Sequence, residues 1–338
     1  MKCKYEQIYI LCPKKYASGG PDALHQLCYY IKKIGFKNVY MVYVDLMNNE
    51  NGLNKKYKIY ETKSINISQI IDSKNTLIVL PENLYRYSCL WKKANISIWW
   101  LSVDNFRKKS IKYDIKNLLI RLLKLDFQNA FIYLKLIFFI NKKIYNNFSA
   151  SYYANDFLNK KNIKNNLLIE PISLEFLNEY KLSYKKIEKE KRKNQILYNP
   201  KKGYKITQKI MQQNDEDYEF IPLTGYNVTE LISLYKSSKL YIDFGLFPGA
   251  ERMPKEAVLF GCNIITGKHG ASQYFNDVPI PSRWKFDDNQ EIEISKAIKK
   301  LINNYEKYND NFEIYKKRVI NLENEFINKL KLYFFTNE

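Results

Sequence analysis

The residues best suited to chemistry in this chain of 338 amino acids lie between positions 240 and 271. An apolar run typical of a strand opens the stretch, and a loop with Gly245, Gly249 and Arg252 follows it. Pro254 suits the first turn of a helix, because its fixed φ matches the helix and its missing N–H costs nothing there. Strand, glycine loop and helix in this order predict an α/β fold whose ligand binds at the carboxyl end of the strand.

Two cations in this stretch occupy positions that disfavour the helix itself. The N-terminus of a helix offers free N–H groups and about half a positive charge, so Arg252 and Lys255 suit this place best if an anion binds there. A charge-assisted contact to a phosphate contributes roughly 1.5–3 kcal/mol. The local pattern favours a phosphate-bearing ligand over the alternative, a solvated loop with scattered charges.

The second half of the stretch resembles the donor-binding segment of GT-B glycosyltransferases, near the retaining group called family 4. Glu256-Ala257, then Gly261 and the apolar run 263–266, match this segment. The resemblance assigns Glu256 to the ribose of the donor, as the second of two glutamates in the family motif. The first glutamate belongs eight positions earlier, where this chain has Pro248.

The loop also resembles a set of bacterial capsule and O-antigen transferases, whose pattern is matched by Asp243-Phe244-Gly245, Pro248-Gly249, Arg252 and Pro254-x-Glu256-Ala257. Both resemblances imply a GT-B fold, an α/β class in which two Rossmann-like domains with parallel sheets face a central cleft. They also imply that cations neutralise the leaving phosphate, which would make Arg252 catalytic. The donor-binding residues implied are Glu256, Lys255, Arg252, Lys202, Gly249, Gly245, Gly19 and Gly20.

Two further loops fit this plan. Gly19 and Gly20 lie between a predicted strand and a predicted helix at 22–34, where they allow either close backbone approach to a ligand or a tight turn. Lys201 and Lys202 follow the predicted strand that opens the second half of the chain. The resemblance assigns these lysines to the donor diphosphate.

Two carboxylates, Glu82 and Asp104, each follow an apolar run that predicts a buried strand. Either residue is placed to act as a general base toward an acceptor hydroxyl in an inverting mechanism. Carboxylates at such positions also commonly cap the next helix, so both interpretations stay open. His25 is likewise suited either to the cleft or to packing.

Length and element order predict two domains. Residues 1–180 would form an acceptor-binding Rossmann-like domain and residues 195–310 a nucleotide-sugar-binding one. The highly charged run 180–194 is predicted to link them, and 311–338 to form a helix that crosses back to the first domain.

Residues 115–145 are rich in Leu, Ile and Phe, with Lys and Arg interspersed. The longest apolar run is shorter than the about 20 residues that span a bilayer. Two interpretations stay open: an amphipathic helical hairpin on an anionic membrane, or a pair of core helices packed on the sheet.

The formal net charge of +20 favours an anionic partner, although a lysine-rich genomic composition explains it as well. Five scattered cysteines are typical of a reduced, cytoplasmic protein, and two histidines argue against a metal site. We therefore expect no cofactor and no metal, with the nucleotide sugar as substrate. The sequence contains no nucleic-acid recognition module.

The resemblance implies a glycosyltransferase that extends a capsule or O-antigen chain from a nucleotide sugar. It implies a lipid-linked or oligosaccharide acceptor and peripheral association with the cytoplasmic face of the inner membrane. Two alternatives stay open. One is a sialyltransferase-like GT-B enzyme that uses a CMP-sugar, and the other is a non-catalytic basic protein that binds membrane or nucleic acid.

Overall fold

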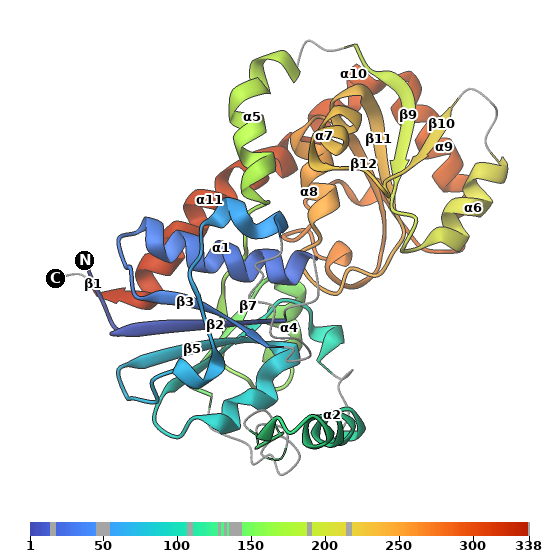
Figure 1. Cartoon of the computed structure of the whole chain (residues 1–338). Helices are drawn as coiled ribbons and strands as arrows, with labels where there is room; N and C mark the ends of the chain where they lie inside the picture. Colours follow the sequence, from blue (N-terminus) through green and yellow to red (C-terminus); the bar gives the residue numbers. More distant parts are fainter. Residues whose placement is uncertain are drawn as a thin grey trace. The chain divides into compact units, whose positions relative to one another are not determined.

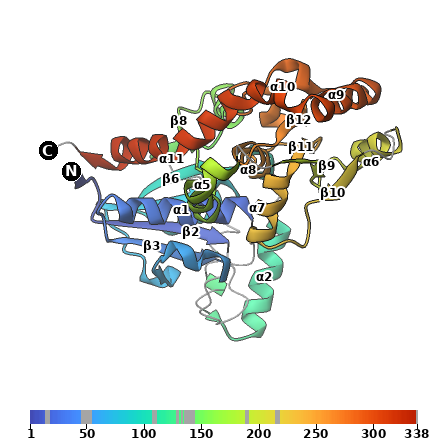
Figure 2. The same cartoon turned by 90° about the horizontal axis from the view of Figure 1, so that it is seen from above.

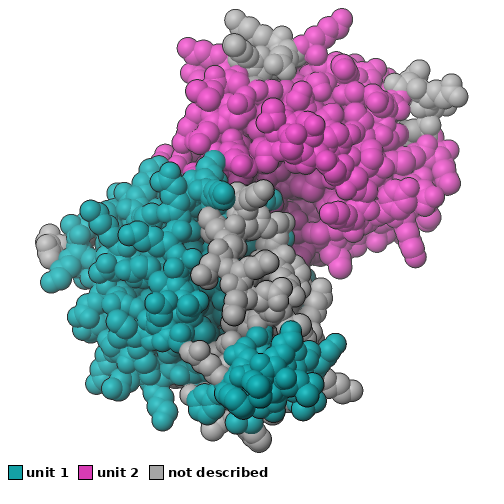
Figure 3. Space-filling view, viewed as in Figure 1, with its two compact units in different colours: residues 1–170, 325–338 teal, residues 171–324 magenta. Residues whose placement is uncertain are grey.

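The computed structural model describes residues 1–13, 18–44, 55–106, 111–127, 130–131, 134, 144–187, 191–213 and 218–336. The chain divides into two compact units (Figure 3). Unit 1 comprises Met1–Glu170 and Glu325–Glu338, and unit 2 comprises Pro171–Asn324.

Unit 1 is built on a seven-stranded parallel sheet in the order β4-β3-β2-β5-β6-β7-β8 (Figure 1). The first of these strands in the chain, β2, lies inside the sheet, so the strand order reverses between β2 and β5. Such a reversal is the usual ligand site of an open α/β sheet. The strands are β2 (Gln7–Pro13), β3 (Val39–Val44), β4 (Ser64–Ile65), β5 (Thr76–Pro81), β6 (Asn95–Trp100), β7 (Asn146–Ser149) and β8 (Asn166–Leu167).

Both faces of this sheet are covered, as the continuous apolar strands require. Tyr9 and Leu11 of β2 pack with Ala154 and Leu158 on one face, and the alternate residues of the strand point to the other face. The helical elements of unit 1 are α1 (Gly19–Lys33), η1 (Lys55–Tyr60), η2 (Ile67–Gln69), η3 (Glu82–Leu90), η4 (Val103–Asn105), α2 (Ile111–Leu123) and α4 (Tyr152–Asn159).

The end of the chain is part of unit 1. In the last turns of α11 (Glu313–Phe334), the ring of Phe326 lies 5.6 Å from that of Tyr30 and 5.9 Å from that of Trp99. Strand β14 (Phe335–Thr336) then pairs antiparallel with β1 (Lys2–Cys3), so the two ends of the chain are held together.

Unit 2 is built on a five-stranded parallel sheet in the order β10-β9-β11-β12-β13 (Figure 1). Here the strand order reverses between β9 and β11. Right-handed crossovers place α6 on one face and α7 and α8 on the other. The strands are β9 (Lys193–Tyr198), β10 (Glu219–Pro222), β11 (Ser238–Asp243), β12 (Asn263–Gly267) and β13 (Lys285–Phe286). The helical elements are α5 (Leu174–Ile187), α6 (Tyr204–Gln213), α7 (Val228–Ser237), α8 (Arg252–Leu259), η5 (Gly270–Gln273), η6 (Ser282–Trp284), α9 (Glu291–Asn303), α10 (Tyr305–Asn309) and η7 (Asp310–Phe312).

The charged run 180–194 is not the linker that its composition predicted. Helix α5 continues through most of it to Ile187, and strand β9 begins at Lys193. Phe176 of α5 is buried, and Glu179 pairs with Lys236 of α7 at 2.7 Å, so this helix packs within unit 2.

The segment 115–145 is described only in part. Helix α2 begins before it, at Ile111, and ends at Leu123, while residues 128–129, 132–133 and 135–143 lie outside the described residues. Within the described ranges, no helix combines the length and the apolar character needed to cross a membrane.

Arg192 joins the ends of three elements in unit 2. Its Nη1 donates to the carbonyl oxygens of Tyr235 and Ser238, at 2.9 and 2.7 Å, and its Nη2 donates to that of Phe260 at 2.5 Å. The guanidinium thereby fixes the end of α8 against the start of β11.

We predict that Arg192→Met lowers the free energy of unfolding of unit 2 by about 2–4 kcal/mol, because three carbonyl groups lose a charged donor. Urea unfolding followed by circular dichroism measures this. Lys191→Met, at the exposed neighbouring position, is the control. An equal effect of the two substitutions would contradict the role given to Arg192.

Candidate functional site

Three loops of unit 2 meet at the carboxyl ends of β9, β11 and β12. These strands are adjacent and parallel, so the loops after them emerge at one edge of the sheet. This is where the strand order of unit 2 reverses, the position at which open α/β sheets bind their ligands. The loops cover residues 199–203, 244–251 and 268–270.

The first two loops touch through backbone. Gly203 has a φ of +64°, and a Cβ added to it would lie 2.4 Å from the carbonyl carbon of Phe244. A Cβ on Gly245 would lie 2.3 Å from that of Lys202. Only glycine allows this approach at either position.

The third loop meets the second in the same way. A Cβ on Gly270, whose φ is +57°, would lie 2.1 Å from the carbonyl oxygen of Phe247. That oxygen accepts a hydrogen bond from the N–H of Ala271 at 2.8 Å. Gly249, predicted to bind the donor, is buried in the second loop.

Asp243 closes the start of the second loop. Its Oδ1 accepts from the N–H of Gly245 at 2.9 Å, and its Oδ2 accepts from the hydroxyl of Tyr241 at 2.8 Å. Burial raises the pKa of this carboxyl to about 6, against the opposing effect of these two donors. Sequence reasoning used Asp243 only as part of a motif, although its place at a strand end before Phe-Gly could have indicated a turn-forming carboxylate.

The N-terminus of α8 lies at the end of the second loop. The helix begins at Arg252, two residues before the predicted start at Pro254, and Glu251 is its N-cap residue. Lys202 Nζ reaches Glu251 Oε1 at 2.7 Å, which brings Lys202 to this helix end. Its neighbour Lys201 is exposed instead.

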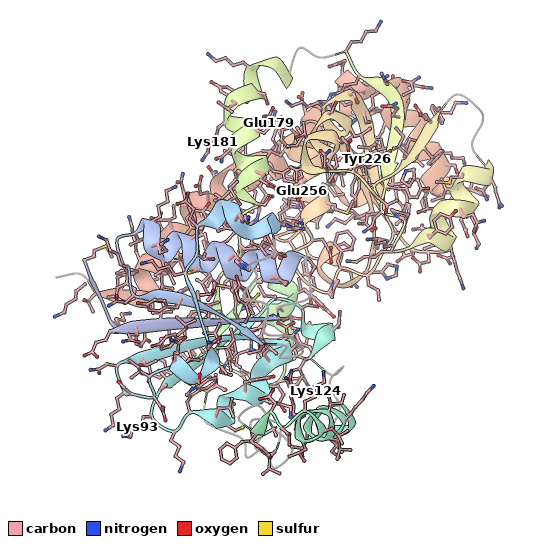
Figure 4. All side chains as sticks on the ribbon, viewed as in Figure 1. Lys93, Lys124, Glu179, Lys181, Tyr226 and Glu256 are labelled. Atoms are coloured by element: carbon pink, nitrogen blue, oxygen red, sulfur yellow. The ribbon has the colours of Figure 1, made fainter. Side chains whose placement is uncertain are left out.

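Two charged side chains of α8 are buried, Lys255 and Glu256, each 4% exposed. Glu256 lies within unit 2 (Figure 4), and its Oε2 accepts from the hydroxyl of Tyr235 at 3.4 Å. Burial and the nearby carboxylate raise the pKa of Tyr235 well above its usual range. Charged residues are rarely buried in this way outside functional or paired sites.

The expectation of a glycine loop before α1 is wrong. Gly19 and Gly20 are the first residues of α1, and Ser18 is the N-cap residue. A Cβ on Gly20 would make only an ordinary contact of 3.7 Å with Leu101. Gly20 therefore meets no steric requirement for close backbone approach at this end of β2.

Glu82 and Asp104 follow β5 and β6, neighbouring strands of unit 1, but their environments differ. Glu82 is buried, and its Oε2 accepts from the N–H of Leu101 at 2.9 Å. Burial raises the pKa of this carboxyl to about 7. Asp104 is exposed and accepts from the hydroxyl of Tyr153 at 3.2 Å.

His25 is a packing residue. It is fully buried, with Nδ1 at 2.6 Å from the carbonyl oxygen of Pro21 and Nε2 at 2.8 Å from the hydroxyl of Tyr43. Burial lowers its pKa, which favours the neutral ring. Among the described residues, no group of three or more His, Cys, Asp or Glu side chains is placed to hold a metal ion.

The chain is similar over almost its whole length to several solved structures. Sucrose-phosphate synthase from Thermosynechococcus elongatus superposes with a TM-score of 0.62 and 12% identity, covering 97% of this chain and 98% of that one. HepE from Anabaena, solved with UDP and glucose, has a TM-score of 0.62 and 11% identity, with 96% and 99% covered. WaaG, a glycosyltransferase involved in lipopolysaccharide biosynthesis, has a TM-score of 0.56 and 12% identity, with 95% and 99% covered.

The chain has the GT-B fold. The expected class, two Rossmann-like units each with a parallel sheet, is confirmed by these similarities and by the strand order. No protein-family model and no curated protein matches its sequence.

The raised pKa of Glu82 predicts a pH dependence of stability. The folded chain keeps a proton that the unfolded chain releases above pH 4.5, so this stabilisation is complete below pH 4.5 and is lost as the pH rises to about 7. The shift converts to roughly 3 kcal/mol. Urea unfolding at acid and at slightly alkaline pH should show that Glu82→Gln removes this part of the pH dependence.

Glu325→Gln, at an exposed position of α11 in unit 1, is the control and should keep the pH dependence of the unsubstituted chain. Comparison of variants is needed because Asp243, with its pKa of about 6, titrates in the same range. An unchanged pH dependence in Glu82→Gln would show that Glu82 is already ionised in the folded state.

Proposed function

We propose that the chain is a glycosyltransferase whose unit 2 holds a nucleotide-sugar donor at the loops after β9, β11 and β12. One observation carries the proposal: three glycine positions bring these loops into backbone contact beside a helix N-terminus with buried, charged side chains. A diphosphate is bound by backbone that can approach it closely and by N–H groups that point toward its oxygen atoms. The similarity to HepE, a structure with UDP and glucose, supports a nucleotide-sugar donor.

Glu256 is proposed to bind the ribose. A carboxylate can accept about four hydrogen bonds, so Glu256 can accept from ribose hydroxyls while Tyr235 also donates to it. Because Glu256 is buried, its hydrogen bonds are stronger than in water. The same role follows from the motif resemblance.

Arg252, Lys255 and Lys202 are proposed to bind the diphosphate, together with the N–H groups of α8. When the bond to the sugar breaks, negative charge grows on the leaving phosphate, and fixed cations and N–H dipoles stabilise that charge. Lys202 is already directed to this helix end by Glu251. Its ammonium can then contact a phosphate bound at the start of α8 while it stays near Glu251.

Unit 1 is proposed to bind the acceptor, with a carboxylate as general base. Asp104 is the better candidate, because it is exposed and can reach an acceptor hydroxyl. The pKa of Glu82, about 7, also suits a base. However, Glu82 is buried and bound to the backbone after β6, so we propose that it positions the strand end that carries Asp104.

We propose further that the acceptor is a lipid-linked or oligosaccharide precursor of a surface polysaccharide, capsule or O-antigen, at the cytoplasmic membrane face. The loop pattern from Asp243 to Ala257 and the similarity to WaaG support this substrate class. Side-chain cations neutralise the leaving group in this scheme, so no metal is required.

A thermal-shift panel of nucleotides and nucleotide sugars tests the donor site. Ligand at about 100 times its dissociation constant should add roughly 2.7 kcal/mol of stability. A UDP, GDP or ADP compound should raise the melting temperature. Glu256→Gln should weaken its binding about tenfold or more, because a neutral amide replaces a charged acceptor.

The matched control for the panel is Glu293→Gln, an exposed glutamate near the start of α9, which should bind like the unsubstituted chain. A shift with CMP compounds alone would favour the sialyltransferase-like alternative. The absence of any shift in the folded chain would contradict the donor site and favour a non-catalytic protein.

The Lys202–Glu251 pair provides a test in which the two substitutions should change the affinity for the diphosphate in different directions. Lys202→Met should lower the affinity for the nucleoside diphosphate about tenfold and leave the affinity for the nucleoside unchanged. Glu251→Gln should keep or raise the affinity for the diphosphate, since it removes a negative charge near the phosphate. Isothermal titration calorimetry measures both.

An ion pair of the same length, Lys209–Glu291 at 2.7 Å, supplies the controls in unit 2. Lys209→Met and Glu291→Gln should leave both affinities unchanged. Equal losses for diphosphate and nucleoside in Lys202→Met would contradict a phosphate contact.

A further inference from the structure

Helix α2 of unit 1 packs Leu118 against the core of this unit, but it also has a second apolar side, which is exposed. Ile115, Leu119, Leu122 and Leu123 lie on one side of it at a helical spacing, and they are 43%, 56%, 44% and 85% exposed. Arg121, on the opposite side, is only 6% exposed. A helix on the surface of a water-soluble protein normally places its leucines toward the core and its arginines toward solvent. The exposed side, here called the α2 apolar face, is therefore suited to contact with an apolar surface rather than with water.

The turn that ends α2 is held by both backbone and side chain. The N–H of Asp126 donates to the carbonyl oxygen of Arg121 at 3.0 Å, and Arg121 Nη1 donates to Asp126 Oδ2 at 2.6 Å. Between them Leu125 has a φ of +55° and is 74% exposed. The pair gives Arg121 Nη1 a charged partner, while Nε and Nη2 of the same guanidinium have no hydrogen-bond partner among the described residues.

The exposed apolar side chains continue beyond α2. Phe127, Phe131 and Leu134 are 65%, 56% and 41% exposed. Together with Leu125 and the α2 apolar face, eight large apolar side chains are exposed among the described residues of 115–134. So many exposed apolar side chains in one stretch of chain are unusual for a surface in water and indicate an interaction site.

Basic residues accompany this surface. Residues 107–145 include ten Lys or Arg and only two Asp or Glu, Asp114 and Asp126. Lys116 and Lys124 are exposed beside the apolar side chains, and Lys124 follows the end of α2 (Figure 4). Figures 1 and 2 both show α2 projecting from the sheet of unit 1.

We propose that α2 and the exposed side chains up to Leu134 dock on the surface of an anionic lipid bilayer. The leucines and phenylalanines would enter the boundary between headgroups and acyl chains, and the lysines would contact anionic headgroups. A second copy of the chain fits less well, because a symmetric interface would bring these like charges together. The length of α2, from Ile111 to Leu123, suits a helix that lies in the interface rather than one that spans it.

The docking surface goes beyond the proposed glycosyl transfer and can be tested without any nucleotide. Its residues belong to unit 1, and none of them is among those proposed to bind the donor. The variant Glu256→Gln should therefore bind vesicles like the unsubstituted chain, so a failure of the donor site would not be mistaken for a failure of docking.

Sedimentation with large unilamellar vesicles tests the proposal. The full chain should bind vesicles of phosphatidylcholine with about one third phosphatidylglycerol, and much more weakly pure phosphatidylcholine, with binding that falls as salt rises. The triple substitution of Leu119, Leu122 and Leu123 to Gln should weaken binding at least tenfold. The double substitution Lys116→Gln, Lys124→Gln should weaken it roughly thirtyfold at low salt, since each basic residue near an anionic surface contributes about a factor of five.

The control is Leu332→Gln, a leucine of unit 1 on α11 that is 67% exposed, together with Leu182→Gln on α5. Both should bind vesicles normally, and the melting temperatures should show that every variant is folded. Unchanged binding in the triple variant, equal binding to neutral vesicles, or no binding at all would overturn the proposal. So would a concentration-dependent dimer of the unsubstituted chain that the triple substitution dissociates and that does not bind vesicles.

Discussion

The backbone contact between three loops of unit 2 is the constraint on which the candidate site depends. Gly203, Gly245 and Gly270 each stand where a Cβ would overlap a neighbouring loop. The resulting cluster orders the start of α8 and brings Lys202 to it. The glycines lose more conformational entropy on folding than other residues, and Asp243 and Arg192 offset part of that cost with hydrogen bonds to backbone. The site is thus preorganised by the fold before any ligand binds.

The two units share an α/β plan but use their strand ends differently. Among the described residues of unit 1, Glu82 accepts from backbone and His25 is enclosed between Pro21 and Tyr43, while the residues directly after β2 and β3, 14–17 and 45–54, lie outside the description. In unit 2 cations and N–H groups gather at the same kind of edge. The cations and N–H groups of unit 2 are the physical reason for proposing the donor there, and the resemblance to GT-B enzymes is the reason for proposing the acceptor in unit 1.

The parts of the fold that the sequence could predict are those with strong local signals. Buried parallel strands are continuous apolar runs, and Gly261, with a φ of +94°, follows the end of α8, where glycine is common. The prediction of a glycine loop before α1 was wrong because glycine is also tolerated in a first helical turn, where N–H groups have no helical partner. The prediction of a linker at 180–194 was wrong because α5 gains its stability from burial of Phe176 and from ion pairs with other elements. The contacts of α5 join residues that lie far apart in the sequence, and the turn held by Asp243 depends on the burial of that residue. The amino-acid composition reveals neither. The sequence likewise left the membrane and core interpretations of 115–145 equal, and the exposed leucines of α2 support the proposal of a docking surface for the part of this segment that the structure describes.

Hydrogen exchange of the whole chain, measured by mass spectrometry with and without the nucleotide that binds best, tests the central claim most directly. If the three loops form the donor site, the nucleotide should slow exchange in peptides that cover residues 199–203, 244–256 and 267–271, because bound phosphate and ribose occupy or rigidify these N–H groups. Peptides of α9 and α10 should exchange at unchanged rates. Protection confined to unit 1, or absent from all three loops at saturating nucleotide, would contradict the account.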